Sequence, residues 1–225
     1  MKYVVFSDIH GNADVLRNLL EKEIAGSDTG FIFCGDVCGY YYETRECIDL
    51  LRGIKGLIAV RGNHDQYYMD AFDEPVMTEK LVKKYGSSYG EKDKVIRDYL
   101  SSLPLVETIN CNGRIIRIQH GTPEDPLEGR LYPDTPLPDI EGGNVFITGH
   151  THYQMYRNSG ESIWLNPGSI GQPRDGKDFS YCKLDTENWN IQFCSINMDI
   201  RRLIQRIRMN DPEDKYLEGI LCRNK

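Results

Sequence analysis

Three short apolar runs near the start of the chain each end in a polar segment that contains glycine. Between these runs, apolar residues recur at helical spacing over 13–24 and 44–51, so strand and helix alternate. This alternation predicts an α/β fold with a parallel sheet and right-handed crossovers, whose strands all end at one edge. The runs are residues 3–6, 31–34 and 57–60, and the polar segments that follow them are 7–12, 35–36 and 61–65.

The second half of the chain has the pattern of a series of β-strands. Residues 106–109 and 114–119 are alternating runs, and the sequence Asn-Cys-Asn-Gly at 110–113 is typical of a hairpin turn between them. A polar loop with five prolines, 121–143, comes next. Further strands are predicted, by apolar runs between glycine, proline and asparagine signals, over 145–148, 154–158, 162–165, 179–185 and 191–197.

Two helical segments are predicted outside this framework of strands. Residues 66–103 are mostly helical in pattern, and we interpret them as a helical cap insertion. Residues 199–223 predict one or two C-terminal helices, with arginines on their solvent face. Neither an internal repeat nor a linker marks a second domain, so we expect residues 1–225 to form a single domain.

Composition argues against several classes of protein. The chain has 27 Lys and Arg against 34 Asp and Glu, a net charge of −7, so long nucleic acids are not expected as partners. Its apolar stretches are far shorter than the about 20 residues that span a bilayer, so no membrane partner is expected. Seven scattered cysteines, an odd number, are typical of reduced thiols and predict a cytoplasmic location.

All five histidines follow an apolar run within a few residues. They occur in the same segments as several carboxylates and an asparagine, and such mixed ligands suit zinc, manganese, iron or nickel. Residues two apart in an extended segment can point to one side, as Asp8 with His10 and His150 with His152 would. Singly these motifs are common by chance, but together they predict a transition-metal site. The segments are Asp8-Ile-His10, Gly35-Asp36, Gly62-Asn-His-Asp65, His120-Gly121 and Gly149-His-Thr-His152.

This ordered set resembles the motifs of the calcineurin-like metallophosphoesterases: Asp-x-His, Gly-Asp, Gly-Asn-His-(Asp or Glu), a lone His and Gly-His-x-His. The resemblance extends from Met1 to about Asp185. Gly39 stands where many members have an Asp, as in the small bacterial and archaeal phosphodiesterases and in relatives resembling diadenosine tetraphosphate hydrolases. Residues 166–175 are also similar to that subgroup.

The resemblance implies a four-layer α/β/β/α sandwich with two divalent metal ions at one edge. Asp36 would bridge the ions, and a hydroxide shared between them would be the nucleophile, as in other two-metal sites. Manganese is favoured, although the ligand types suit iron, zinc or nickel as well. By family pattern, the first ion would be held by Asp8, His10, Asp36 and His152, and the second by Asp36, Asn63, His120 and His150.

The resemblance also assigns a catalytic role to His64, and the neighbouring Asp65 is predicted to support it. His64 would donate to the leaving oxygen or stabilise developing charge, and Asp65 would hold the imidazole protonated and oriented. The alternative interpretation is that these two residues cap the next helix.

Substrate contacts are predicted at Asn12 and Arg174. An arginine suits bidentate phosphate binding, but Arg174 could equally form a surface ion pair with Asp175 or Asp178. Five tyrosines near the metal segments could stack a nucleobase, or could instead cover the rim of the core. They are Tyr40, Tyr41, Tyr42, Tyr67 and Tyr68.

These features predict an enzyme, a metal-dependent phosphoesterase that hydrolyses small phosphodiesters, including nucleotide-derived ones. A dinucleoside polyphosphate hydrolase and a phosphomonoesterase are alternatives within the same chemistry. A protein-interaction scaffold is the non-enzymatic alternative, because a retromer subunit resembles this fold without the catalytic histidine, which His64 supplies here. A homodimer is expected from the family.

Overall fold

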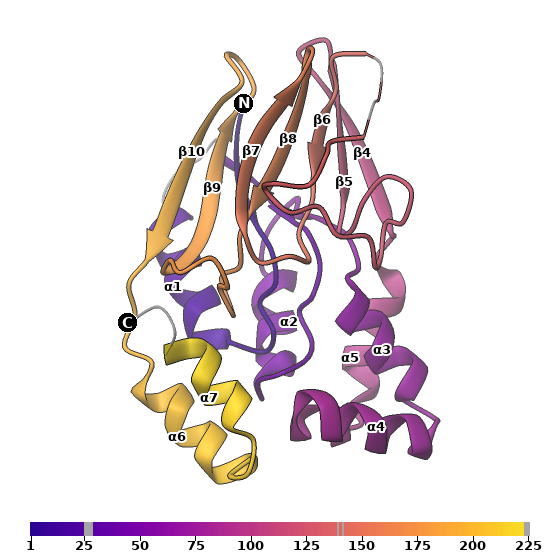
Figure 1. Cartoon of the computed structure of the whole chain (residues 1–225), viewed down its shortest axis with the longest axis vertical. Coiled ribbons are helices and arrows are strands. Elements are labelled where there is room, and N and C mark those ends of the chain that lie inside the picture. Colours follow the sequence, from indigo (N-terminus) through magenta and orange to yellow (C-terminus); the bar gives the residue numbers. More distant parts are fainter. Residues whose placement is uncertain (25–28, 139, 141, 223–225) are drawn as a thin grey trace.

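The computed structural model describes residues 1–24, 29–138, 140 and 142–222. Two five-stranded sheets lie side by side, and helices gather below them in the view of Figure 1. Sheet A has the order β10-β9-β1-β2-β3, and sheet B has the order β4-β5-β6-β8-β7. The strands of sheet A are β1 (Lys2–Phe6), β2 (Thr29–Phe33), β3 (Ile58–Ala59), β9 (Phe179–Asp185) and β10 (Asn190–Ile196). Those of sheet B are β4 (Val106–Cys111), β5 (Arg114–Gln119), β6 (Val145–Ile147), β7 (Gln154–Ser159) and β8 (Ser162–Pro167).

The predicted parallel unit forms the centre of sheet A. Strand β1 pairs in parallel with β2, and β2 with β3, while β9 and β10 add an antiparallel hairpin. Because successive side chains of a strand point to opposite faces, β1 contributes to two cores. Val4 and Phe6 pack in the core with helices α1 (Ala13–Glu23) and α2 (Thr44–Arg52). Tyr3 and Val5 pack between the two sheets, so both faces of β1 are buried.

Sheet B begins with the predicted hairpin. Cys111 of β4 lies opposite Arg114 of β5, and the two residues between them have positive φ angles, 46° at Asn112 and 80° at Gly113. An Asn-Gly pair accepts this left-handed conformation readily, so it fixes the register of the hairpin. Strands β5, β6 and β8 run parallel, and their carboxyl ends therefore point the same way.

The outer face of sheet B is covered by the proline-containing loop. Leu131 and Leu137 of the loop pack against Phe146 and Trp164, whose rings stack with centroids 4.2 Å apart. The predicted α/β/β sandwich is confirmed, and in the described part of the chain its fourth layer is this loop instead of a helix. Five prolines explain the difference, because proline removes a backbone donor and breaks a helix interior. Within the predicted range 121–143, residues 139 and 141 lie outside the described residues.

The cap comprises three helices and a short 3-10 turn beyond the ends of the sheets. They are α3 (Asn63–Ala71), α4 (Pro75–Tyr85), η1 (Ser87–Gly90) and α5 (Lys94–Ser102). Helix α3 begins three residues before the predicted start of the cap at 66, since Gly62 is its N-cap and the metal motif forms its first turn. The last residues of the third polar segment are therefore held on a helix and not on a free loop.

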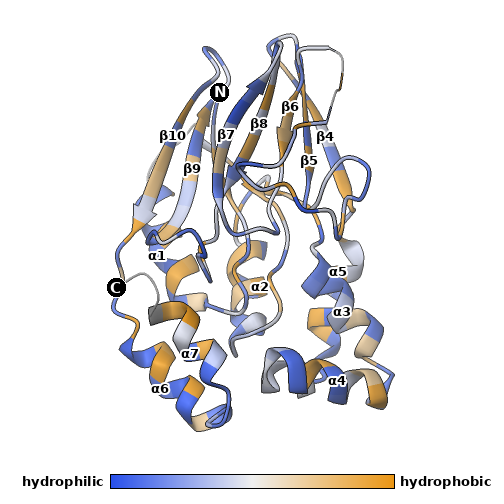
Figure 2. Ribbon diagram, viewed as in Figure 1, coloured by the Kyte–Doolittle hydropathy of each residue, from blue (hydrophilic) through white to orange (hydrophobic). Residues whose placement is uncertain are grey.

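Two C-terminal helices, α6 (Arg201–Asn210) and α7 (Lys215–Cys222), lie beside the cap. Figure 2 shows apolar and polar sides on the helices, and Leu203 and Ile207 of α6 are buried. The loop between α6 and α7 is bonded to the cap and to the loop before α2: the Asp211 carboxylate accepts from Ser87 N and Ser87 Oγ of the cap and from Tyr42 Oη, all at 2.7–2.9 Å. Arg223, the end of the predicted helical segment, lies outside the described residues. Among the helices described, none is long and apolar enough to cross a membrane.

Candidate metal centre

The predicted ligands all follow strands that run parallel to a neighbour. Asp8 and His10 come after β1, Asp36 after β2, and Asn63 after β3 in the first turn of α3. His120 follows β5, and His150 and His152 follow β6. The carboxyl ends of the parallel strands of both sheets therefore meet at one place, as the alternating pattern predicts for sheet A.

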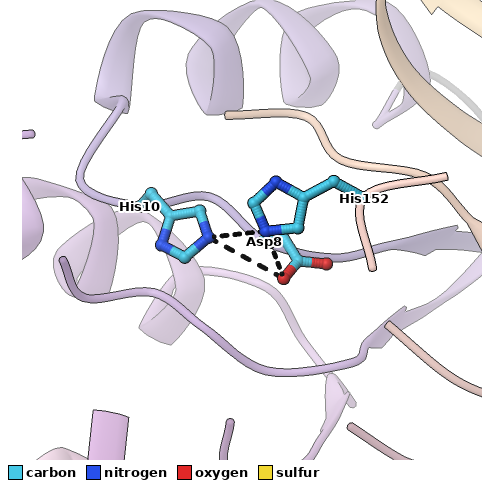
Figure 3. A group of neighbouring side chains, drawn as sticks. All are labelled: Asp8, His10 and His152. Carbon is cyan, nitrogen blue, oxygen red and sulfur yellow. Dashed lines mark hydrogen bonds and ion pairs between the residues drawn. The ribbon is translucent and has the colours of Figure 1, made fainter. Parts of the chain in front are cut away.

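The structure gathers six of these side chains into two groups. Asp8, His10 and His152 form one group, and Asp36, His120 and His150 form the other; within each, the donor atoms lie within 4.8 Å of one another. The three side chains of the first group point toward one another in Figure 3. In it, Asp8 Oδ1 is 3.2 Å from His152 Nε2, and the Nε2 atoms of His10 and His152 are 3.1 Å apart.

The histidines of the first group present lone pairs to each other. His10 Nδ1 is 2.8 Å from the Cys38 carbonyl and His152 Nδ1 is 2.5 Å from the Gln172 carbonyl, so each Nδ1–H donates to the backbone. Burial lowers the pKa of both imidazoles well below the ordinary value, which keeps them neutral and leaves Nε2 unprotonated. Two buried lone pairs at this separation repel unless a cation lies between them, so the group fits a metal ion.

Unpaired carboxylate oxygens strengthen that fit. Both Oδ atoms of Asp8 and Nε2 of His150 are buried and make no hydrogen bond. A buried carboxylate that lacks hydrogen bonds is costly unless a cation compensates its charge. Nitrogen and oxygen donors in this combination are those of transition-metal sites, and the two groups are accordingly sites for divalent metal ions.

Asp36 contacts both groups. Its Oδ2 is 3.2 Å from His120 Nε2 and 3.9 Å from His10 Nε2. Asn63, the remaining predicted ligand, places Oδ1 3.0 Å from His120 Nε2. The structure thus brings all seven predicted ligands into one buried cluster, with Asp36 at its centre.

The second group differs from the first in its protonation. Burial alone would lower the pKa of His120, but the adjacent Asp36 carboxylate raises it to about 10. His150, which is buried close to His120, has its pKa lowered to about 2 by burial first and by that neighbour second. Burial raises the pKa of Asp36 itself. One imidazole of this group is therefore basic and the other remains neutral.

Backbone conformation at the ligands is unusual. Five of them have φ angles in the left-handed region that non-glycine residues rarely adopt, which places local strain at this site. Glycines at two neighbouring positions are required by space: a Cβ at Gly62 would lie 2.0 Å from Asp36 Oδ1, and one at Gly149 would lie 2.1 Å from Ser7 Oγ. The five ligands are Asp8 (56°), His10 (51°), Asp36 (65°), His150 (65°) and His152 (62°).

Asp65 does not contact the imidazole of His64, and that expectation is wrong. Its carboxylate instead accepts four backbone N–H groups at 2.9–3.0 Å, which tie the loop after β2 to the start of α3. One of these donors is Gly62, so the helix-capping alternative is confirmed for Asp65. Burial lowers the pKa of His64, so its ring is neutral and not held protonated. Asp65 acts as a positioning residue for the backbone around Asp36. The other donors are Asp36, Val37 and Cys38.

Tyrosine rings surround His64. Two of the five tyrosines singled out in the sequence are among them, and two others come from the cap and have no signal in the sequence near the metal motifs. Their centroids lie 4.7–6.1 Å from the imidazole centroid. Tyr41, Tyr42 and Tyr68 bond elsewhere, to Gln172, Asp211 and the Asp93 backbone. The surrounding rings are Tyr40, Tyr67, Tyr85 and Tyr89.

Arg174 lies beside these tyrosine rings, in contact with Tyr40, and not in a surface ion pair. Its Nη2 donates to Gln172 Oε1 at 2.7 Å and to Tyr40 Oη at 3.1 Å, and its Nε is buried without a hydrogen bond. Asn12 is the N-cap of α1, where Oδ1 accepts from Val15 N at 3.4 Å, while its Nδ2 is buried without a partner. Both side chains thus retain buried donors.

Comparison with known proteins agrees with this site. A model of the calcineurin-like phosphoesterase superfamily domain matches residues 1–189. The protein MJ0912 of Methanocaldococcus jannaschii is 30% identical, over 92% of this chain and 91% of that protein. Phosphodiesterase YfcE of Escherichia coli is 23% identical, over 93% and 99%. The crystal structure of the protein PH1004 from Pyrococcus horikoshii has a TM-score of 0.84 at 20% identity and covers 100% of this chain and 98% of that one.

These relatives are bacterial and archaeal, as the resemblance of the motifs predicts. The family match includes every predicted ligand, from Asp8 to His152. Paired buried groups of imidazole and carboxylate donors supply the metal sites that such an enzyme requires. The chain belongs to the calcineurin-like phosphoesterase superfamily and is a metal-dependent phosphoesterase.

Proposed function

We propose that this enzyme hydrolyses small phosphodiesters, including nucleotide-derived ones, at a dinuclear metal centre. The observation that carries the proposal is the position of Asp36, whose Oδ2 lies within 4 Å of a histidine from each ligand group. A shared carboxylate is what brings two ions close enough to act on one phosphoryl group. The printed name of the Escherichia coli relative, a phosphodiesterase, supports the choice of diesters.

The proposed ligands of the two ions overlap at Asp36. Two divalent ions bound there would polarise a phosphoryl oxygen and make a water molecule more acidic. We favour manganese, with iron, zinc or nickel as alternatives, since the mixed nitrogen and oxygen donors suit all four metals. The first ion is assigned to Asp8, His10, Asp36 and His152, and the second to Asp36, Asn63, His120 and His150.

Three further side chains are assigned to the substrate. The neutral imidazole of His64, which buried tyrosine rings surround, donates a hydrogen bond to the leaving oxygen and stabilises the charge that develops on it. The guanidinium of Arg174 binds non-bridging phosphoryl oxygens through its unpartnered Nε, and the unpartnered Nδ2 of Asn12 adds a second donor. None of these three roles requires a serine or cysteine nucleophile, because the water held by the metal ions would attack the phosphorus.

The experiment is hydrolysis by metal-stripped protein to which Mn²⁺, Mg²⁺, Ni²⁺ or Zn²⁺ is added back singly. A generic aryl phosphodiester and the matching monoester are compared under each metal. Metal-dependent cleavage that favours the diester supports the proposal, whereas preference for the monoester favours the phosphatase alternative. If a panel of nucleotides shows a preference for dinucleoside polyphosphates, the alternative of a dinucleoside polyphosphate hydrolase is favoured. If the protein binds metal but hydrolyses no phosphoester, the non-enzymatic alternative of a protein-interaction scaffold is favoured.

The remaining assignments concern the whole chain. We propose that residues 1–225 form one domain, with 66–103 as its cap and 199–223 as its C-terminal helices. A cytoplasmic location is supported by the free thiols of the six cysteines whose side chains the structure describes. A homodimer is proposed from the family, and analytical ultracentrifugation would test it. The net charge of −7 supports a small substrate in preference to a long nucleic acid.

A further inference from the structure

The hydroxyl of Tyr89 is bonded to the imidazole of His64. Tyr89 Oη lies 2.6 Å from His64 Nδ1, and both rings are buried, with exposed fractions of 1% and 6%. The same hydroxyl is 3.4 Å from the His64 carbonyl, near the outer limit of a hydrogen bond. The short contact is therefore the dominant one. It gives His64 Nδ1 a partner in place of the Asp65 carboxylate, which bonds to backbone N–H groups.

Gly39 leaves the space that this contact occupies. A Cβ at Gly39 would lie 2.6 Å from His64 Nδ1 and 2.9 Å from Tyr89 Oη, both closer than real side chains tolerate. Its φ of 89° also belongs to the left-handed region. A side chain at this position would therefore displace either the imidazole or the tyrosine. The chain has glycine where the loop after β2 passes the histidine, and a hydroxyl from the cap bonds to the histidine there.

Tyr89 belongs to the cap and not to the strand-end loops. It lies in η1, and Ser87 of the same turn is fixed by the Asp211 carboxylate, which is 2.9 Å from both Ser87 N and Ser87 Oγ. The turn is therefore connected to the loop between α6 and α7. Burial raises the pKa of Tyr89 well above its ordinary value, so the phenol retains its proton.

We propose that Tyr89 is the positioning residue of His64: its hydroxyl donates to Nδ1, fixes the plane of the ring and places the N–H on Nε2, where it donates a hydrogen bond to the leaving oxygen. This inference rests on the proposed phosphodiesterase function, in which His64 donates to the leaving oxygen. The bond also makes catalysis depend on the docked cap, because η1 carries the hydroxyl. The most basic leaving groups will depend most on this bond, because they develop the most negative charge on the leaving oxygen, whereas aryl oxides of low basicity leave with little stabilisation.

The test compares Tyr89→Phe with wild type, both loaded with the metal that supports turnover. The substrates are aryl phosphodiesters whose leaving groups differ in basicity. We expect kcat of the variant to fall about 10- to 100-fold for the most basic leaving group and to change little for the least basic one. KM should change little for either substrate. A second readout does not need turnover: the ¹⁵N shifts of His64 in Zn²⁺-loaded protein report which ring nitrogen carries the proton. In Tyr89→Phe these shifts should move toward a mixture of tautomers.

Tyr68→Phe is the matched control. Tyr68 is also buried in the cap, and its hydroxyl accepts from Asp93 N at 2.9 Å without contacting His64. It should lose comparable stability but retain the leaving-group dependence and the His64 shifts of wild type. Two outcomes would overturn this inference alone. In one, wild type is active and Tyr89→Phe is unaffected; in the other, Tyr89→Phe loses kcat equally for all leaving groups and its His64 shifts are unchanged. A wild-type protein that hydrolyses no phosphoester with any metal would overturn the proposed function and this inference with it.

Discussion

Two parts of the site are built in different ways: the cluster of metal ligands, here called the pocket, and the tyrosine rings around His64, here called the wall. Every ligand of the pocket lies within a few residues of the end of a strand, and the backbone of five of them is held in the left-handed region. The wall combines Tyr40 from a strand-end loop with Tyr67, Tyr85 and Tyr89 from the cap. The chemistry is therefore encoded locally, whereas the groups that face the substrate depend on tertiary packing.

The largest expected effect is the loss of the shared carboxylate. Asp36→Ala removes the side chain that contacts both ligand groups, so we expect bound metal to fall and kcat to drop more than about 1000-fold. Elemental analysis and a diester assay measure the two effects. Asp49→Ala, which removes an exposed carboxylate on α2, is the control. Full metal content with retained turnover in Asp36→Ala would show that the two groups work independently.

His64→Ala separates the wall from the pocket. The His64 ring belongs to neither ligand group, although its edge packs against His10 with centroids 5.0 Å apart, so the variant should keep its metal and lose about 100-fold or more in kcat. Metal content measured on the same preparation is the control. Unchanged turnover would contradict the role of His64, and loss of metal would show that the wall and the pocket are not separable.

Removal of metal should destabilise the pocket far more than the cap. Metal bound at about 100 times its Kd stabilises a protein by about 2.7 kcal/mol, and for a chain of this size that corresponds to a shift in Tm of about 5–10 °C. Calorimetry with and without chelator measures the shift. Hydrogen exchange should increase at the strand-end loops and stay unchanged in α4 and α5. Equal increases in both regions would mean that they unfold together.

The smallest effect is expected at the bond between the cap and the C-terminal helices. Asp211→Ala leaves Ser87 N and Tyr42 Oη without their acceptor, at a cost of about 1–2 kcal/mol because the site is only partly buried. Urea unfolding measures the loss. Asp73→Ala, an exposed carboxylate of the cap, should cost much less. Equal stability of the two variants would mean that the α6–α7 loop does not hold the cap.

The same difference explains how much the sequence predicts. The succession of strands along the chain, the hairpin and the seven candidate ligand side chains could be predicted, because each depends on neighbours in sequence. The acceptor role of Asp65 is missed because backbone N–H groups from a distant loop leave no pattern in residue types. Tyr89 is missed because it reaches His64 from 25 residues away through the fold of the cap. The outer cover of sheet B is a loop because its prolines exclude a helix while its leucines still seal the sheet.

The basic imidazole in the second ligand group also has a thermodynamic consequence. With a pKa of about 10, His120 carries a proton at neutral pH when no metal is bound, and Nε2–H then lies between Asp36 Oδ2 and Asn63 Oδ1. The folded value exceeds the unfolded one of about 6.5, so this stabilisation is complete below about 6.5 and is lost as pH rises through 10. A metal ion must displace that proton. Loading is thus an ion exchange that acidifies its medium, and its heat will vary with the ionisation enthalpy of the buffer.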